Sequence, residues 1–186
     1  MPWIENIGLS DVSKGRHHAA GENSMLIQIV DPAMNFPTAM HKFKETHQFE
    51  FLDLEGPDAY GSEFKVTDEQ AAELVRLLQH ALDKRMNVVV HCVAGVCRSG
   101  AVCEVGVMMG FTDCEGFRSP NLLVKHKMMK VLGWTYDENE PHTINGVTLD
   151  SGLIVPAKAV EWTNKTEKVF TLATARREQR KREGDI

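Results

Sequence analysis

The sequence lacks the long apolar runs that membrane-spanning segments need. No stretch approaches the ~18 to 20 uninterrupted apolar residues of a transmembrane helix, and the first five residues do not follow the charged-then-apolar order of a secretory signal. We therefore expect a soluble protein that stays in the cytoplasm and has no membrane partner.

An excess of basic charge is also missing. The chain carries 21 Lys and Arg against 26 Asp and Glu, a formal net charge of -5. Proteins that bind nucleic acids gain affinity by neutralising phosphates with clustered Lys and Arg, so no nucleic-acid partner is expected. The exception is a basic tail at 176–186, which predicts a solvated helix end, with a docking segment for an acidic partner as the alternative.

Cysteine is scarce and confined to a short part of the chain. The four cysteines, at positions 92, 97, 103 and 114, lie within 23 residues and form no Cys-x-x-Cys pair. This distribution argues against the disulfide framework of a secreted protein. No tetrahedral zinc set can be read from the spacing of Cys and His. We expect free thiols in a reducing compartment and no metal.

The rest of the pattern is typical of one globular domain spanning 1–186. The chain has 186 residues, 42% of them hydrophobic and 25% charged, without repeats. Strands are predicted at 25–30, 49–52 and 87–91, helices at 67–85, 99–109, 119–132 and after Pro156, and loops at 54–66, 111–120 and 133–150. Alternating strands and helices predict an α/β fold: a central, mostly parallel β-sheet flanked by helices, with the apolar strand 87–91 in its middle.

Residues 91–100 carry the chemistry, because they join a predicted buried strand to a buried helix. Such a loop directs backbone N–H groups and the helix dipole at one point, which suits phosphate. The same surroundings lower the pKa of a thiol, so Cys92 is the candidate nucleophile. Arg98 can bind two phosphoryl oxygens through its planar fork. Ser99 places a hydroxyl at the helix start, where it can stabilise the thiolate.

The segment His91-Cys92-Val93-Ala94-Gly95-Val96-Cys97-Arg98-Ser99 resembles the signature His-Cys-x-x-Gly-x-x-Arg-Ser/Thr of protein tyrosine phosphatases. It is most similar to the small dual-specificity type, of the compact kind found in bacteria and phages. The resemblance covers about 25–132, leaves 133–186 as a C-terminal extension, and implies the phosphatase fold without a cofactor. It also implies that Cys92 forms a cysteinyl-phosphate, that His91 holds the loop, and that the substrate phosphate is bound by Val93, Ala94, Gly95, Val96, Cys97 and Arg98.

The resemblance also implies a general acid, an Asp that lies some tens of residues before the cysteine. Asp53 ends the run Phe49-Glu50-Phe51-Leu52-Asp53, which resembles the strand-then-Asp pattern of the dual-specificity type. Asp58 follows Gly56 and Pro57, which suit a mobile loop. Asp53 is preferred, and Asp58 remains the alternative general acid.

Cys97 departs from most dual-specificity phosphatases, which have a small residue such as Ser before the arginine. A low-pKa thiolate oxidises readily, and a neighbouring thiol can trap the product as a disulfide. A Cys92–Cys97 redox pair is therefore one hypothesis for this position. The alternative is that Cys97 is a small packing residue.

The loop interior also bears on the substrate. It contains no lysine, which disfavours phosphoinositides, and the acidic chain disfavours RNA 5'-phosphates. We expect a phosphorylated protein as the partner of a monomeric enzyme, with phosphotyrosine preferred and phosphoserine or phosphothreonine as further substrates. Two alternatives stay open: a non-catalytic phosphopeptide-binding module, and sulfur chemistry of the rhodanese or arsenate-reductase kind.

Overall fold

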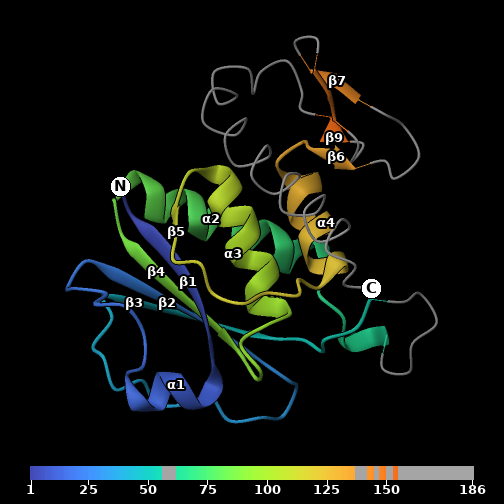
Figure 1. The fold of residues 1–186 in the computed structure, drawn as a ribbon. Coiled ribbons are helices and arrows are strands. Elements are labelled where there is room, and N and C mark those ends of the chain that lie inside the picture. The colour runs from blue at the N-terminus through green and yellow to red at the C-terminus, as the bar shows by residue number, and fades with distance from the viewer. Residues whose placement is uncertain (56–61, 137–141, 145–146, 150–152, 155–186) are drawn as a thin grey trace, which may run out of the picture.

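A computed structural model describes residues 1–55, 62–136, 142–144, 147–149 and 153–154. Five parallel strands form the central sheet in the order β3-β2-β4-β1-β5 (Figure 1). Their bounds are β1 Trp3–Gly8, β2 Ser24–Val30, β3 Glu45–Glu50, β4 Asn87–Cys92 and β5 Thr112–Asp113. The predicted α/β class with a mostly parallel sheet is confirmed.

Helices cover both faces of this sheet (Figure 1). One face is covered by α1 (Leu9–Lys14), and the other by α2 (Asp68–Asp83), α3 (Arg98–Met109) and α4 (Leu122–Val131). A 3-10 turn, η1, spans Ser62–Phe64. Further along the chain, β6 (Thr135–Tyr136) pairs antiparallel with β9 (Leu153–Ile154), and β7 (His142–Ile144) pairs antiparallel with β8 (Val147–Leu149).

The predicted central strand is β4, which lies between β1 and β2. Val88 and Val90 pack into the larger hydrophobic cluster, on the side of α2 to α4, while Val89 packs into the smaller cluster on the side of α1. A strand that is buried on both faces needs apolar residues at successive positions. This is why its sequence shows a continuous apolar run.

Two helices were also predicted by local signals. At the start of α2, Thr67 and Gln70 form a reciprocal capping box, in which the Gln70 N–H donates to Thr67 Oγ1 at 3.1 Å. In α3, ten of the twelve residues are buried, as expected for a helix that is apolar nearly all round. The burial of α3 places its N-terminus against the carboxyl end of β4.

Other elements differ from the prediction. β1 was not predicted. β3 begins at Glu45 rather than at residue 49; its first residues were missed because it is an edge strand with polar outward side chains, so it lacks a long apolar run. The helix predicted from Ser119-Pro120 begins at Leu122, since Asn121 is the residue that caps it: its Oδ1 accepts from the Val124 N–H at 3.0 Å. The region predicted as a loop at 133–150 contains β6, β7 and β8.

Several predictions lie outside the described residues, namely Asp58, the helix after Pro156 and the basic tail at 176–186. In the part of the chain that is described, none of the helices has the length and apolar character required to cross a bilayer.

Candidate active site

Cys92 is the last residue of β4, and residues 93–97 form a loop that leads from it into α3. Its side chain is buried, with 1% of the residue exposed. The Gly95 N–H donates to Cys92 Sγ at 3.2 Å, and the Ser99 hydroxyl lies 3.2 Å from the same sulfur. The sulfur at the N-terminus of this buried helix therefore accepts from one backbone N–H and shares a hydrogen bond with a hydroxyl that is able to donate.

The shape of the 93–97 loop depends on Gly95, whose φ is +77°. A Cβ at this position would lie 2.3 Å from the backbone nitrogen of Gly8, at the end of β1, so only glycine fits. The Gly95 carbonyl accepts a 2.7 Å hydrogen bond from Asn6 Nδ2, and the Val93 carbonyl accepts from the Leu9 N–H at 3.3 Å. Hydrogen bonds from Asn6 of β1 and from Leu9, the residue that follows β1, therefore hold the loop in place.

Asn6 is itself held in place by a buried network. Its Oδ1 accepts from Arg118 Nε at 2.6 Å, and Arg118 forms a bidentate pair with Asp113 at 2.5 and 3.1 Å. The Arg118 contact fixes which end of the Asn6 amide faces Gly95, because guanidinium groups only donate. The network thus orients the group that supports the 93–97 loop.

Arg98 is the first residue of α3, and only 4% of its side chain is exposed. Its Nη1 donates to Asp31 Oδ1 and to the Phe51 carbonyl, both at 2.6 Å. Among the described residues, its buried Nε has no hydrogen-bond partner. A buried N–H without a partner costs about 1–3 kcal/mol, so this edge of the guanidinium fits a site that binds an anion.

Asp53 lies three residues beyond β3, on an exposed segment. Its Oδ1 accepts from Asn121 Nδ2 at 2.7 Å, and the Asn121 backbone N–H donates to the Cys97 carbonyl at 3.1 Å. Burial and the nearby Asp53 carboxylate raise the pKa of the Cys97 thiol. The structure therefore brings Asp53 beside the loop that follows Cys92.

His91 lies next to Cys92 within β4 and is fully buried. The pKa of its ring is lowered to about 4, chiefly by burial; the nearby Cys92 backbone opposes this shift and the positive charge of Arg98 adds to it. The backbone contact falls short of hydrogen-bond geometry, and within the described chain neither ring nitrogen has a partner. His91 is thus a neutral ring packed behind the loop.

Three contributors to this site were missed in the sequence: Asp31, Asn6 and Asn121. Asp31 had a usable signal, because it directly follows β2 and the carboxyl ends of neighbouring parallel strands meet at one edge of the sheet. Asn6 and Asn121 had none, because each acts on residues more than 60 positions away.

No protein-family model matches the sequence, and no curated protein matches it. Among solved structures, the chain is similar to OH1 from the Orf virus, a tyrosine phosphatase with triple substrate specificity, at 19% identity and a TM-score of 0.41. That similarity covers 59% of this chain and 57% of OH1, so the chain spans just over half of its length.

Two further solved structures are similar to this chain. The human tyrosine phosphatase-like serine/threonine/tyrosine-interacting protein has 17% identity and a TM-score of 0.49, covering 70% of this chain and 91% of that one. Tk-PTP, solved in its active form, has 15% identity and a TM-score of 0.38, covering 89% and 90%.

Proposed function

We propose that the protein is a cysteine-dependent phosphatase of the protein tyrosine phosphatase kind that hydrolyses phosphate monoesters. The observation that carries the proposal is the unpaired Nε of the buried Arg98, at the start of the helix whose preceding loop begins at Cys92. Phosphoryl transfer to sulfur needs a thiol at an anion-binding site and a group that binds the phosphoryl oxygens, here the planar guanidinium of Arg98.

In the first step, the phosphate is bound by Arg98 and by backbone N–H groups of the 93–97 loop. The Cys92 thiolate attacks phosphorus, a sulfur–phosphorus bond forms, and the bond from phosphorus to the ester oxygen breaks. The leaving oxygen takes a proton from Asp53. Stabilisation of the transferring group is mainly electrostatic, because its charge is spread over three equatorial oxygens.

In the second step, water attacks the cysteinyl-phosphate and gives its proton to Asp53, which now acts as a base. Phosphate leaves and the thiolate is restored. The Ser99 hydroxyl, 3.2 Å from Cys92 Sγ, stabilises the sulfur as it regains its negative charge. These steps need no metal or organic cofactor.

Phosphorylated proteins are the proposed substrates, with phosphotyrosine preferred and phosphoserine or phosphothreonine as further substrates. The exposed carboxylates Asp53 and Glu55 lie near Cys97 of the 93–97 loop, where burial raises the pKa of the thiol and both carboxylates raise it further. They disfavour ligands with several phosphates, because each further phosphate would be placed near a like charge. Matched peptides that differ only in the phosphorylated residue would measure this preference as kcat/KM.

The proposal is tested by p-nitrophenyl phosphate hydrolysis in the presence of a reductant and a metal chelator. We expect turnover that vanadate inhibits, and a phosphate adduct on the Cys92 peptide after rapid acid quench and mass spectrometry. If a folded chain binds phosphotyrosine peptides without turnover, the protein is instead a phosphopeptide-binding module. Sulfur transfer from thiosulfate without phosphatase activity would favour the rhodanese kind of chemistry.

Replacing Asp53 with asparagine is expected to lower kcat for phenyl phosphate by about 100-fold, within the range of general acids. The loss should be smaller for p-nitrophenyl phosphate, because a more acidic leaving group needs less help from a proton donor. Asp83→Asn, on the exposed end of α2, is the matched control. An equal, small effect on both substrates would argue against Asp53 and transfer the role to Asp58.

A further inference from the structure

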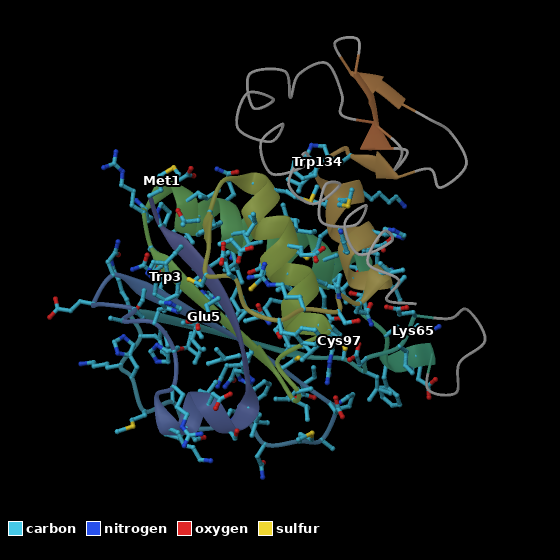
Figure 2. All side chains as sticks on the ribbon, viewed as in Figure 1. Met1, Trp3, Glu5, Lys65, Cys97 and Trp134 are labelled. Atoms are coloured by element: carbon cyan, nitrogen blue, oxygen red, sulfur yellow. The ribbon has the colours of Figure 1, made fainter. Side chains whose placement is uncertain are left out.

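A second group of side chains with metal-ligand chemistry lies outside the 93–97 loop. Glu5, His18 and Cys114 each offer one ligand atom, and these atoms all lie within 4.8 Å of one another. Figure 2 shows Glu5 on β1, well apart from Cys97 at the start of α3. The three residues are separated by 13 and 96 positions in the chain, so only the fold brings them together.

The backbone holds two of the three residues in adjacent strands. Glu5 belongs to β1, and Cys114 directly follows β5, which pairs in parallel with β1. The Cys114 N–H donates to the carbonyl of Ile4 at 3.4 Å, so the two residues occupy neighbouring positions at one edge of the sheet. The pairing of β1 with β5 therefore fixes where Glu5 and Cys114 lie relative to one another.

The third residue is held by Glu5 itself. The backbone N–H of His18 donates to Glu5 Oε2 at 2.8 Å, and His18 Nδ1 lies 3.0 Å from Glu5 Oε1. Only 14% of the Glu5 side chain is exposed, whereas 60% of the His18 side chain is exposed. The cluster thus has a half-buried carboxylate, a thiol next to a strand end and an exposed imidazole ring that can change its rotamer.

The charges around the cluster suit a cation. Glu5 is an acidic residue of the cluster, and a second acidic residue, Asp113, lies next to Cys114 in the chain. Arg118 is already bound to Asp113 through two hydrogen bonds of 2.5 and 3.1 Å, and its third contact is with Asn6. A divalent ion would balance the Glu5 carboxylate and a Cys114 thiolate together.

We propose that Glu5, His18 and Cys114 bind Zn²⁺, with a fourth position open to solvent on the exposed side of His18. Thiolate, imidazole and carboxylate are the ligands that zinc takes in proteins, at ~2.3, ~2.0 and ~2.1 Å. Tetrahedral geometry at these lengths places ligand atoms about 3.3–3.6 Å apart. Side-chain rotation would have to open the 3.0 Å separation of His18 Nδ1 and Glu5 Oε1 slightly and close the wider separations, which are at most 4.8 Å. On binding, the Cys114 thiol loses its proton, and any proton shared by His18 and Glu5 is released as well. Both protons pass to solvent.

This site is independent of the proposed phosphatase chemistry, because none of its three residues contacts Cys92 or Arg98 in the hydrogen bonds of the described chain. It does adjoin the support of the 93–97 loop, since Asn6 follows Glu5 and bonds to Gly95. Zinc would therefore join β1, β5 and the segment after α1 at one point.

The test uses Co²⁺ added to the full chain, because a cobalt–thiolate bond gives a charge-transfer absorption that reports cysteine ligation. We expect one equivalent of Co²⁺ to produce this band and Zn²⁺ to displace it. Cys114→Ser should abolish the band, and Cys92→Ser, the matched control, should retain it. A band that survives Cys114→Ser, or is lost in Cys92→Ser instead, overturns the proposal, as does the absence of any band.

Two further variants keep the test decisive if Cys114→Ser does not fold. His18→Ala changes an exposed side chain and should leave the fold intact, as measured by circular dichroism and thermal unfolding. We expect His18→Ala and Glu5→Gln each to weaken Co²⁺ affinity at least ~10-fold, since even partners outside the ligand set contribute this much. Unchanged affinity in both variants would show that the metal is bound elsewhere.

Discussion

Cys92→Ser is expected to lower kcat for p-nitrophenyl phosphate by about 10⁴-fold or more, the scale on which removal of a covalent nucleophile acts in other enzymes. A serine hydroxyl is a far weaker acid than a thiol, and it would have to be deprotonated before attack. Within the described residues, the groups hydrogen-bonded to the sulfur are the Gly95 N–H and the Ser99 hydroxyl, and neither is a base that could remove that proton.

The same variant should still bind phosphate, because Arg98 and the loop backbone are unchanged. Isothermal titration with inorganic phosphate would measure this, alongside steady-state turnover. Circular dichroism and thermal unfolding of Cys92→Ser are the control for folding, and both should match the native chain. Residual activity of Cys92→Ser within tenfold of the native chain would rule out Cys92 as the nucleophile.

Arg98→Lys is expected to reduce kcat/KM by about 10²- to 10³-fold, the effect of removing one donor from a site that stabilises a transition state. Lysine keeps the positive charge but cannot present Nε and a second nitrogen in one plane. It would also have to satisfy Asp31 and the Phe51 carbonyl with a single ammonium group, because the native Nη1 contacts both. The charge would then be drawn away from the phosphate.

Two further variants distinguish the planar geometry of the Arg98 guanidinium from its positive charge. Asp31→Asn keeps an oxygen that can accept from Arg98 Nη1, so we expect a smaller loss, mainly in kcat. Arg76→Lys is the matched control, since Arg76 is an exposed arginine on α2 that pairs with Glu73. If Arg98→Lys kept native kcat/KM, a point charge would suffice, and the fork would have no part in binding phosphate.

Local signals in the sequence predicted those elements whose stabilising residues lie within the element itself. The capping box of Thr67 and Gln70 defines the start of α2, and the apolar run of β4 reflects burial on both faces. β1 was missed because its residues include Glu5 and Asn6, which look like surface residues. Asn6 is nevertheless buried, since Gly95 and Arg118 satisfy its amide from distant parts of the chain.

The residues of the candidate site also fall into two groups: those that one short segment supplies, and those that the fold brings together from distant positions. Cys92, Arg98 and Ser99 stand within eight residues of one another, so a single segment predicts them. Asp31 reaches Arg98 across 67 positions, and Asp53 reaches Asn121 across 68. No spacing rule connects such pairs, because the sheet order and the packing of α4 decide which of them meet.

Asn121 joins the two segments on which the proposed chemistry depends. Its side-chain amide donates to Asp53 at 2.7 Å, and its backbone N–H donates to the Cys97 carbonyl at 3.1 Å. One buried residue therefore links the segment that carries Asp53 to the loop that follows Cys92. If Asp53 and Cys92 act as proposed, the distance between these two segments would set how bulky a leaving group can be. A longer or shorter side chain at this position is a route by which the range of accepted esters could change while the sulfur and its arginine stay the same.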